Sequence, residues 1–243
     1  MESIFYYFSL PKKCYLNKKI FKKLILEQIK LGATDKKVII DDIKELRVGY
    51  SLNPDNIAIS AYSDDEREYL EIQFITVRLR APKRAERIAE ILHRSIPYPL
   101  VLLLECEGLT MLHLAEKRLS LADSGKMTVE HRVYTGWLGL SNLRKVESDF
   151  FQSLEGLPYT NFLAYYRAIA ERVIALNCAE LSGCFELGKK NRQEALETIR
   201  KLRQQQDEIR VKLKKEKNMG TKVALNTKIK QIDARIDSIK TAL

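Results

Sequence analysis

Cysteine, histidine, glycine and proline are all scarce in this sequence of 243 residues. It has four cysteines, three histidines, ten glycines, six prolines and one tryptophan. No Cys-x-x-Cys pair occurs, and the chain is much larger than the small domains that depend on disulfides. This scarcity argues against a disulfide framework and against structural zinc. It predicts free thiols in a reducing cytoplasm.

Long apolar runs and phosphate-binding glycine motifs are also missing. The longest apolar run, residues 100–104, is far shorter than the roughly 20 residues that a membrane-spanning helix needs. No basic region precedes the apolar N-terminal stretch, so we expect neither a signal peptide nor a membrane anchor. Gly-x-Gly-x-x-Gly, phosphate-loop and Gly-x-Ser-x-Gly patterns are absent, which argues against ATP binding and acyl transfer. We expect a soluble cytoplasmic protein.

Positive charge is in excess, and most of the excess lies near the C-terminus. The formal net charge is +10. From Asn191 onward, 14 Lys and Arg residues stand against seven Asp and Glu residues, a net of +7. Clustered positive charge attracts nucleic acids and acidic protein surfaces alike. Lys and Arg also commonly cover the exposed face of a coiled coil, so the charge alone does not choose a partner.

Apolar residues in this C-terminal segment recur with the spacing of a coiled coil. Each of two series steps alternately by about four and three residues, which is a heptad seam. The series are Ala195, Ile199, Leu202, Gln206, Ile209 and Leu213, and Leu225, Ile229, Ile232, Ile236, Ile239 and Leu243, with Gln206 as the one polar position. The two seams are out of phase, and Asn218-Met219-Gly220 lies between them, where glycine readily ends a helix. We predict an antiparallel helical hairpin that turns there; one long helix that dimerises is the alternative.

Upstream of the hairpin, the pattern predicts an α+β core with a mixed six-stranded sheet: three strands, a helix and three more strands. The predicted strands are residues 47–52, 56–61, 69–79, 100–105, 109–119 and 127–138. The predicted helices are residues 18–31, residues 82–96, and a long helix that starts at 158–160 and stops at Gly183. The domain organisation is then a core at 1–140, a helical segment packing on it at 141–190, and a basic hairpin arm at 191–243.

Two groups of basic residues are candidates for contact with DNA or a protein partner. They are Lys18, Lys19, Lys22 and Lys23 near the N-terminus, and Arg203, Arg210, Lys212, Lys214 and Lys215 in the hairpin. Other constellations carry less chemistry. His113 and His131 could face one another on adjacent predicted strands, but two imidazoles without a nearby carboxylate or thiolate make a poor metal site.

A metal-dependent nuclease is the alternative enzymatic hypothesis. Its pattern is Pro-Asp followed by Glu-x-Lys, in which two carboxylates hold a divalent ion and the lysine stabilises the attacking water. Here Asp55 and Glu71 supply the carboxylates, but Gln73 replaces the lysine. Pro54-Asp55 is also typical of a tight turn. Mg²⁺ is expected as a cofactor only under this hypothesis; otherwise we expect no catalytic residue, metal or cofactor.

Four segments carry a resemblance to a known family. They are Asp-Asp-Glu-Arg-Glu-Tyr-Leu-Glu-Ile at 64–72, Arg-Ile-Ala-Glu-Ile at 87–91 running on to Ile-Pro-Tyr-Pro at 96–99, Ala-Glu-Lys-Arg at 115–118, and Thr-Asn-Phe at 160–162. With them the sequence resembles, over nearly its whole length, an uncharacterised bacterial and archaeal family, the domain of unknown function numbered 4391. The resemblance implies no chemistry. It implies a setting, because members are often encoded beside restriction-type helicases and DNA methyltransferases.

The expected function is therefore that of a non-catalytic accessory subunit in a restriction-like defence against phage DNA. The core would dock on a helicase or DNA methyltransferase, and the basic arm would contact DNA or a protein partner. The nuclease with Asp55 and Glu71 stays open as one alternative. A purely structural, self-associating protein is the other.

Overall fold

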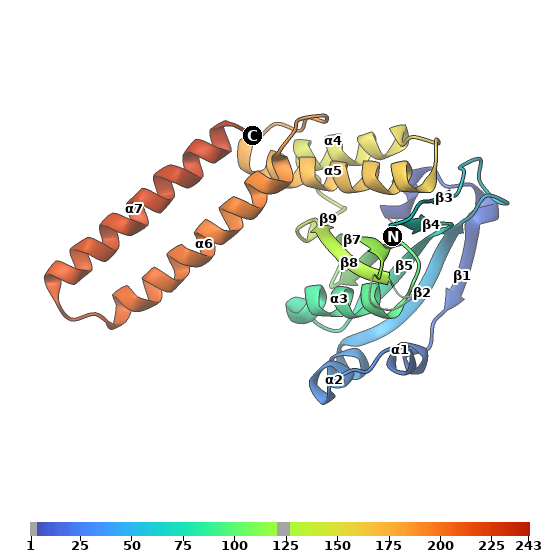
Figure 1. The fold of residues 1–243 in the computed structure, drawn as a ribbon, viewed down its shortest axis with the longest axis horizontal. Helices are drawn as coiled ribbons and strands as arrows, with labels where there is room; N and C mark the ends of the chain where they lie inside the picture. The colour runs from blue at the N-terminus through green and yellow to red at the C-terminus, as the bar shows by residue number, and fades with distance from the viewer. Residues whose placement is uncertain (1–3, 121–126) are drawn as a thin grey trace. The chain divides into compact units, whose positions relative to one another are not determined.

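Strand β6 (Leu100–Cys106) is the central strand of the sheet, and its sequence explains its position. In the computed structural model, which describes residues 4–120 and 127–243, its first five side chains are fully buried. A strand that is apolar on both sides needs cover on both faces. Helices lie on both sides of the sheet (Figure 1): α1 (Lys22–Gln28), α2 (Ala33–Asp42) and α3 (Ala85–Ser95) on one, and α4 (Lys145–Ser153) with the first part of α5 (Phe162–Ser182) on the other.

Six strands form the main path of the sheet, as predicted. Their order is β1 (Tyr15–Lys19), β2 (Ile43–Leu52), β5 (Ile72–Leu79), β6, β7 (Leu109–Leu119) and β8 (Met127–Tyr134), and the short β9 (Leu138–Gly139) pairs with β7. Among the strands described, only β5 and β6 pair in parallel, and α3 connects these two. The fold is a mixed α+β sheet with packed helices.

Two of the predicted elements near the N-terminus are wrong. Residues 56–61 form turns and one isolated bridge in place of a strand, because Asn56 bonds the backbone locally: its Oδ1 accepts from the Asn53 N–H (3.0 Å) and its Nδ2 donates to the Ser51 carbonyl (2.8 Å). Residues 18–31, predicted as one helix, are helical only within α1, and residues 18 and 19 belong to strand β1. All five residues of β1 are exposed, so the strand shows no alternation of apolar and polar residues.

The two faces of the sheet have different cores. The face under α1, α2 and α3 is aliphatic and includes Leu46, Val48, Ile75 and Val77. The opposite face is aromatic: the ring of Phe74 meets rings from the 3₁₀ helix η1 (Ile4–Phe8) edge to face, with centroids 5.1 and 5.4 Å apart. Such edge-to-face pairs are favourable beyond the area they bury.

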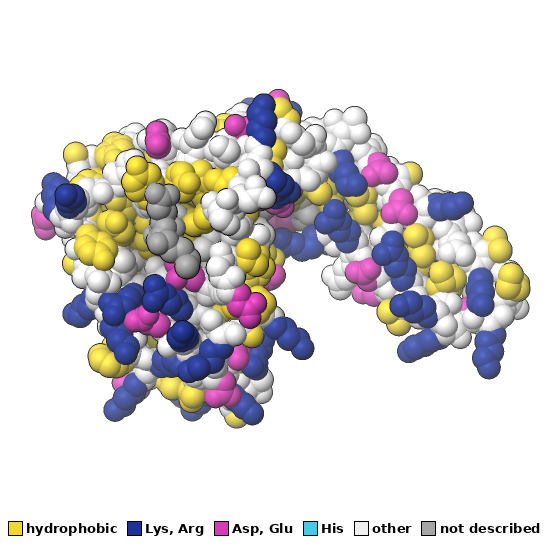
Figure 2. Space-filling view, turned by 180° about the vertical axis from the view of Figure 1, so that it is seen from behind, with side chains coloured by type: hydrophobic (Ala, Val, Ile, Leu, Met, Phe, Trp, Pro, Cys, Tyr) yellow, Lys and Arg dark blue, Asp and Glu magenta, His cyan; other side chains and the backbone are white. Residues whose placement is uncertain are grey.

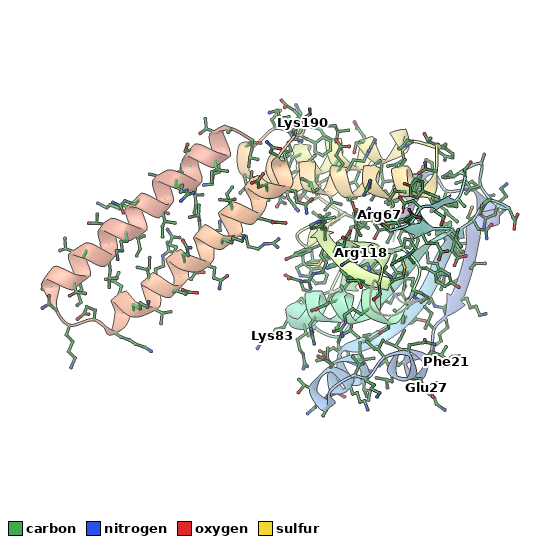
Figure 3. The ribbon with its side chains drawn as sticks, viewed as in Figure 1. Phe21, Glu27, Arg67, Lys83, Arg118 and Lys190 are labelled. Carbon is green, nitrogen blue, oxygen red and sulfur yellow. The ribbon has the colours of Figure 1, made fainter. Side chains whose placement is uncertain are left out.

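A short hairpin fixes the loop that leads into β5. It consists of β3 (Tyr62–Ser63) and β4 (Glu68–Tyr69). Between them, Arg67 forms an ion pair with Glu130 of β8 at 3.0 Å, and Arg118 of β7 pairs with the same carboxylate at 3.1 Å. Arg67 and Arg118 can be followed in Figure 3. The shared carboxylate ties the hairpin to the far edge of the sheet.

The chain divides into two compact units, residues 1–173 and residues 174–243. In the second unit, α6 (Arg192–Lys215) and α7 (Met219–Thr241) pack against each other as the predicted hairpin. Every predicted seam residue is buried or half-buried, and the buried Gln206 donates from Nε2 to Asp233 Oδ1 at 2.5 Å. None of the helices in the described part of the chain has the length and apolar character to cross a membrane.

The turn of the hairpin differs in detail from the prediction. It lies at residues 216–218, and Gly220 is inside the first turn of α7. Asn218 begins this helix, because its side-chain oxygen accepts a hydrogen bond from the Thr221 N–H at 3.1 Å. The predicted role of Gly220 as a helix stop is therefore wrong. The left-handed glycine that ends α5, Gly183, is where the sequence placed it.

A buried lysine fastens the end of α3. Lys117 is fully buried, and its Nζ donates to the carbonyls of Ile96 (2.5 Å) and Tyr98 (2.6 Å), which follow directly after the helix. The C-terminal end of a helix attracts positive charge. Burial opposes this attraction and lowers the pKa of Lys117 to about 7.

A pair of buried histidines lies close to Lys117. Nε2 of His93 and Nδ1 of His113 are 3.1 Å apart, and the ring of His113 stacks on Tyr134 with an interplanar angle of 4°. Burial lowers the pKa of both imidazoles, that of His113 to about 3. The expected proximity of His113 to His131 is wrong, because the partner comes from α3 and not from the neighbouring strand.

We expect Lys117→Met to lower the free energy of unfolding by about 1–3 kcal/mol, because methionine fills similar space but leaves two carbonyls without a donor. Urea denaturation at neutral pH measures the loss. The folded-state pKa of Lys117 is about 7. An unfolded lysine has a pKa of about 10.4, so the wild type gains stability from this group as pH rises between these values. The difference in free energy of unfolding between wild type and Lys117→Met should widen as pH rises. A difference that does not change with pH would contradict the lowered pKa of Lys117.

Acidification should also destabilise the protein through His113. An unfolded imidazole has a pKa of about 6.5, so at pH 5 it binds a proton that the buried ring does not, at a cost of about 2 kcal/mol. Unfolding curves at pH 7.5 and pH 5 measure this loss. The His113→Leu variant lacks the ring and should lose less over the same range; equal losses in the two proteins would rule out the contribution of His113.

Candidate functional site

One end of the aromatic face of the sheet carries charged side chains in place of apolar ones. Strand residues alternate between the two faces, so Glu45 and Arg47 lie opposite the buried Leu46 and Val48 of the aliphatic core. The register then sets the neighbours. Glu45 pairs with Arg78 of β5, and Arg78 pairs with Glu105 of β6, across three adjacent strands.

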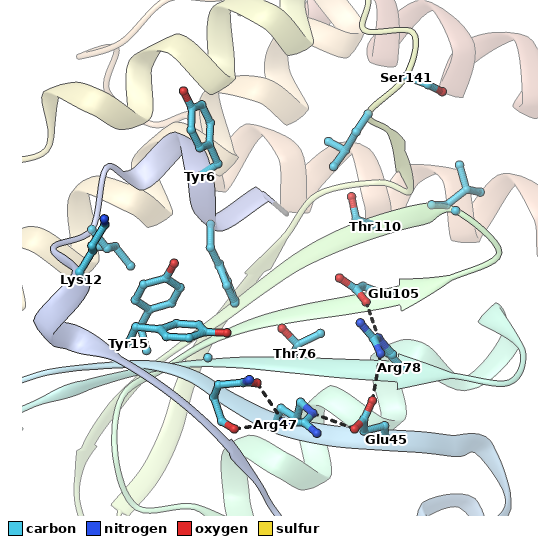
Figure 4. Close-up of a pocket in the computed structure, with 18 residues that line it drawn as sticks. Tyr6, Lys12, Tyr15, Glu45, Arg47, Thr76, Arg78, Glu105, Thr110 and Ser141 are labelled. Atoms are coloured by element: carbon cyan, nitrogen blue, oxygen red, sulfur yellow. Dashed lines mark hydrogen bonds and ion pairs between the residues drawn. The ribbon is translucent and has the colours of Figure 1, made fainter. Parts of the chain in front are cut away.

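These side chains form a continuous ion row, which we define as Asn17, Arg47, Glu45, Arg78 and Glu105 (Figure 4). Arg78 contacts Glu45 at 3.0 Å and Glu105 at 3.1 Å. Arg47 contacts Glu45 at 2.7 Å and donates to the Asn17 side chain at 2.9 Å. The hydrogen bond from Arg47 lowers the pKa of Glu45, and the bond to Glu105 raises the pKa of Arg78, so the row stays charged at neutral pH.

The ion row is part of the lining of a cavity of about 900 Å³. In Figure 4, Tyr6, Lys12 and Tyr15 stand on one side of this space, Thr110 and Glu105 on the other, and Thr76 between them. Ligand pockets commonly have about 300–1,000 Å³. Four aromatic rings contribute to its wall, namely those of Phe5, Tyr6, Tyr15 and Tyr50.

Gly49 allows one aromatic ring to approach the sheet at this point. A Cβ atom built on Gly49 would lie 3.0 Å from the ring of Phe5, closer than real Cβ atoms normally come to a neighbour. Any side chain here would push the ring of Phe5, which lines the cavity. The shape of the cavity wall therefore depends on a residue that has no side chain.

A basic segment, residues 12–23, includes the edge strand β1, which forms part of the cavity lining. It contains six lysines and no acidic residue. Lys18 and Lys19 are exposed on β1, and Lys12 lines the cavity. Of the predicted candidates in α1, Lys22 donates to the Ile40 carbonyl at 2.7 Å, whereas Lys23 is exposed and lies 3.7 Å from Glu27.

The hairpin carries its positive charge at one end. The candidates Arg203, Arg210, Lys212, Lys214 and Lys215 are all exposed. Residues 210–230, which surround the turn and which we call the hairpin tip, hold eight Lys and Arg residues and one Glu. The remainder of residues 191–243, which includes Arg203, holds six of each sign. The whole excess of the hairpin, +7, is therefore located at its tip, and Figure 2 shows Lys and Arg side chains along it.

The candidate nuclease residues lie at the opposite end of β2 from the ion row. Asp55 is exposed in the turn at residues 53–56, and its N–H donates to the Asn53 side chain at 3.1 Å. Glu71 directly precedes β5 and accepts a hydrogen bond from Gln73 at 2.9 Å. Within residues 4–120 and 127–243, no group of three or more His, Cys, Asp or Glu side chains could hold a metal ion.

Sequence patterns did not locate the cavity. Its lining comes from β1, β2, β5, β6, β7 and the segments at residues 5–12 and 140–141, and only the sheet register brings these together. A usable signal was present, because Glu45, Arg47 and Arg78 are charged residues in strands whose alternate positions are apolar. Such residues must point to a face that is open to water.

Comparison with known proteins places the chain in a family. The model of the domain of unknown function DUF4391 matches residues 8–236. The chain belongs to this family. No curated protein and no solved structure is significantly similar to this DUF4391 protein. The match covers both units, so the cavity and the hairpin tip both lie within the DUF4391 region.

The ion row should be dispensable for the stability of the DUF4391 protein. The Arg78 side chain is 55% exposed. Exposed ion pairs contribute about 0–1 kcal/mol, so we expect Arg78→Met to lower the free energy of unfolding by less than about 1 kcal/mol. Leu102→Ala, in the buried centre of β6, is the reference and should cost about 2–5 kcal/mol. Urea denaturation of both variants checks this; similar losses in the two would show that the row is structural.

Proposed function

We propose that this DUF4391 protein is a non-catalytic accessory subunit of a restriction-like defence against phage DNA, acting in the cytoplasm without a cofactor of its own. Its body docks on a helicase or DNA methyltransferase subunit, and its hairpin tip contacts the DNA. The setting follows from the family resemblance. The observation that carries the proposal is the charge of the tip, +7 within 21 residues.

The structure of the hairpin supports a role in contact. Its seam residues face each other, so the polar side chains of both helices remain on the outside. Helix α6 has 24 residues and therefore extends about 36 Å. The exposed lysines of the tip are solvated and free to pair with phosphates, and each such pair releases counterions from DNA. This is a non-specific mode of binding, set by charge and not by base sequence.

The body offers an exposed apolar surface suited to a protein partner. Phe21 and Leu24 of the α1 region are 64% and 50% exposed, and Ile40 of α2 is 50% exposed. The hydrogen bond from Lys22 to the Ile40 carbonyl holds these two helices together. Large apolar side chains gathered on a surface commonly mark protein–protein contacts. This surface supports docking of the body on the partner subunit.

Charge reversal at the tip tests the DNA contact. We expect the triple variant Lys212→Glu, Lys214→Glu and Lys215→Glu to weaken binding to a labelled duplex about tenfold or more in about 50 mM salt, because phosphate contacts dominate such binding. Fluorescence anisotropy measures it. The matched control is Lys201→Glu, Arg203→Glu and Arg235→Glu, which reverses three exposed charges in the balanced part of the hairpin. The control should bind nearly as the wild type does.

Two outcomes would contradict the proposal. Equal weakening by both triple variants would mean that only the overall charge matters, and no weakening by either would remove the tip from DNA binding. Polyglutamate serves as the probe for an acidic protein surface. If it displaces the duplex at equal concentration of charge, the tip recognises acidic chains in general and the DNA assignment is wrong.

A further inference from the structure

We propose that the cavity on the aromatic face of the sheet binds one unpaired base of a single-stranded nucleic acid, and that the basic segment at residues 12–23 holds the adjoining phosphates. This site lies within residues 1–173 and is independent of the hairpin tip. It would therefore exist whether or not the tip binds duplex DNA. Three features of the cavity favour this ligand: its aromatic wall, its alternating floor and its basic rim.

The aromatic wall fits a flat ring. Tyr15 and Tyr50 lie with ring centroids 5.2 Å apart, and Tyr15 is 52% exposed. Tyr6, another residue of the lining (Figure 4), is 72% exposed. Exposed tyrosines lining a pocket offer unoccupied ring faces. Stacking of bases on such rings is a main source of affinity for single strands, and it tolerates any base because every base has a flat face.

The floor of the cavity alternates donors and acceptors. In the ion row, Arg47 and Arg78 use Nε and Nη1 for their partners, and Glu105 uses Oε2. The Nη2 groups of both arginines and Oε1 of Glu105 have no hydrogen-bond partner in the described structure. The edge of a base also presents donors and acceptors side by side, so it can pair with this floor. A phosphate offers acceptors only, so it could pair with the two arginines but not with the two carboxylates between and beside them.

The rim supplies the positive charge that a nucleic-acid backbone needs. Lys12 lines the cavity, and beyond Asn17 the edge strand β1 continues with the exposed Lys18 and Lys19. The segment has six lysines and no acidic residue. A strand running along β1 would therefore place phosphates on lysines and one base in the cavity. A base in a duplex is stacked between its neighbours and cannot enter such a pocket without being extruded.

The decisive experiment compares two oligonucleotides of the same length, one with bases and one abasic throughout. We expect the wild-type full chain to bind the base-bearing strand about tenfold more tightly, as base stacking predicts. Thr76→Trp places a bulky ring in the middle of the cavity and Tyr15→Ala removes an aromatic ring from its wall, so either variant should lose this preference. Tyr159→Ala is the matched control, because Tyr159 is an aromatic residue of similar exposure, 48% against 52% for Tyr15, that does not line the cavity.

The outcomes separate this site from the tip and from other ligands. Circular dichroism confirms that each variant is folded, and Tyr15→Ala, at an exposed edge position, stands in if Thr76→Trp is not. If both folded variants keep the wild-type preference for bases, the cavity does not hold a base. A free nucleoside monophosphate that displaces the strand at micromolar concentration would assign the cavity to free nucleotides and overturn the proposal. Loss of duplex binding alone, in the triple tip variant, concerns only the hairpin.

Discussion

The burial of β6 on both faces is the constraint on which the rest of the structure depends. Five consecutive apolar side chains require a layer of helices on either side of the sheet, and segments on both sides of β6 in the sequence supply them. At the ends of β5 and β6, the same strand register that aligns apolar residues at the centre aligns Arg78 with Glu105. The cavity and its ion row are thus a product of sheet pairing rather than of a local motif.

The net positive charge of the protein is concentrated in two short segments. Residues 12–23 carry +6 and residues 210–230 carry +7, so the remaining residues together are slightly acidic. Charges on a protein surface act over about 10 Å in 0.1 M salt. Each basic segment therefore attracts polyanions locally, and neither gives the whole protein a uniformly positive field. The net charge of the whole chain does not reveal this division. It becomes apparent once the hairpin turn is located, because residues 210–230 surround that turn.

The local spacing of apolar residues predicted some elements correctly and missed others. Strands β6 and β7, helix α3 and both seams of the hairpin have strong repeating apolar patterns and were predicted from them. Strand β1 was missed because both of its sides are exposed, and the six-strand count was right only because a wrong strand at 56–61 replaced it. In the candidate site, the sequence identified only exposed lysines, such as Lys18 and Lys19. The cavity required long-range register, and the pairing of His93 with His113 required helix–sheet packing.

The edge strand β1 has a further consequence for how the protein behaves at high concentration. An exposed edge invites another strand to add to the sheet, which is a common route to aggregation. Here Asn17 has a φ of 48°, the pairing register shifts between Tyr15 and Lys18, and two exposed lysines follow. A kinked strand that carries two like charges is a poor template for a second copy of itself. The features that make this edge available to a polyanion also keep the sheet from growing.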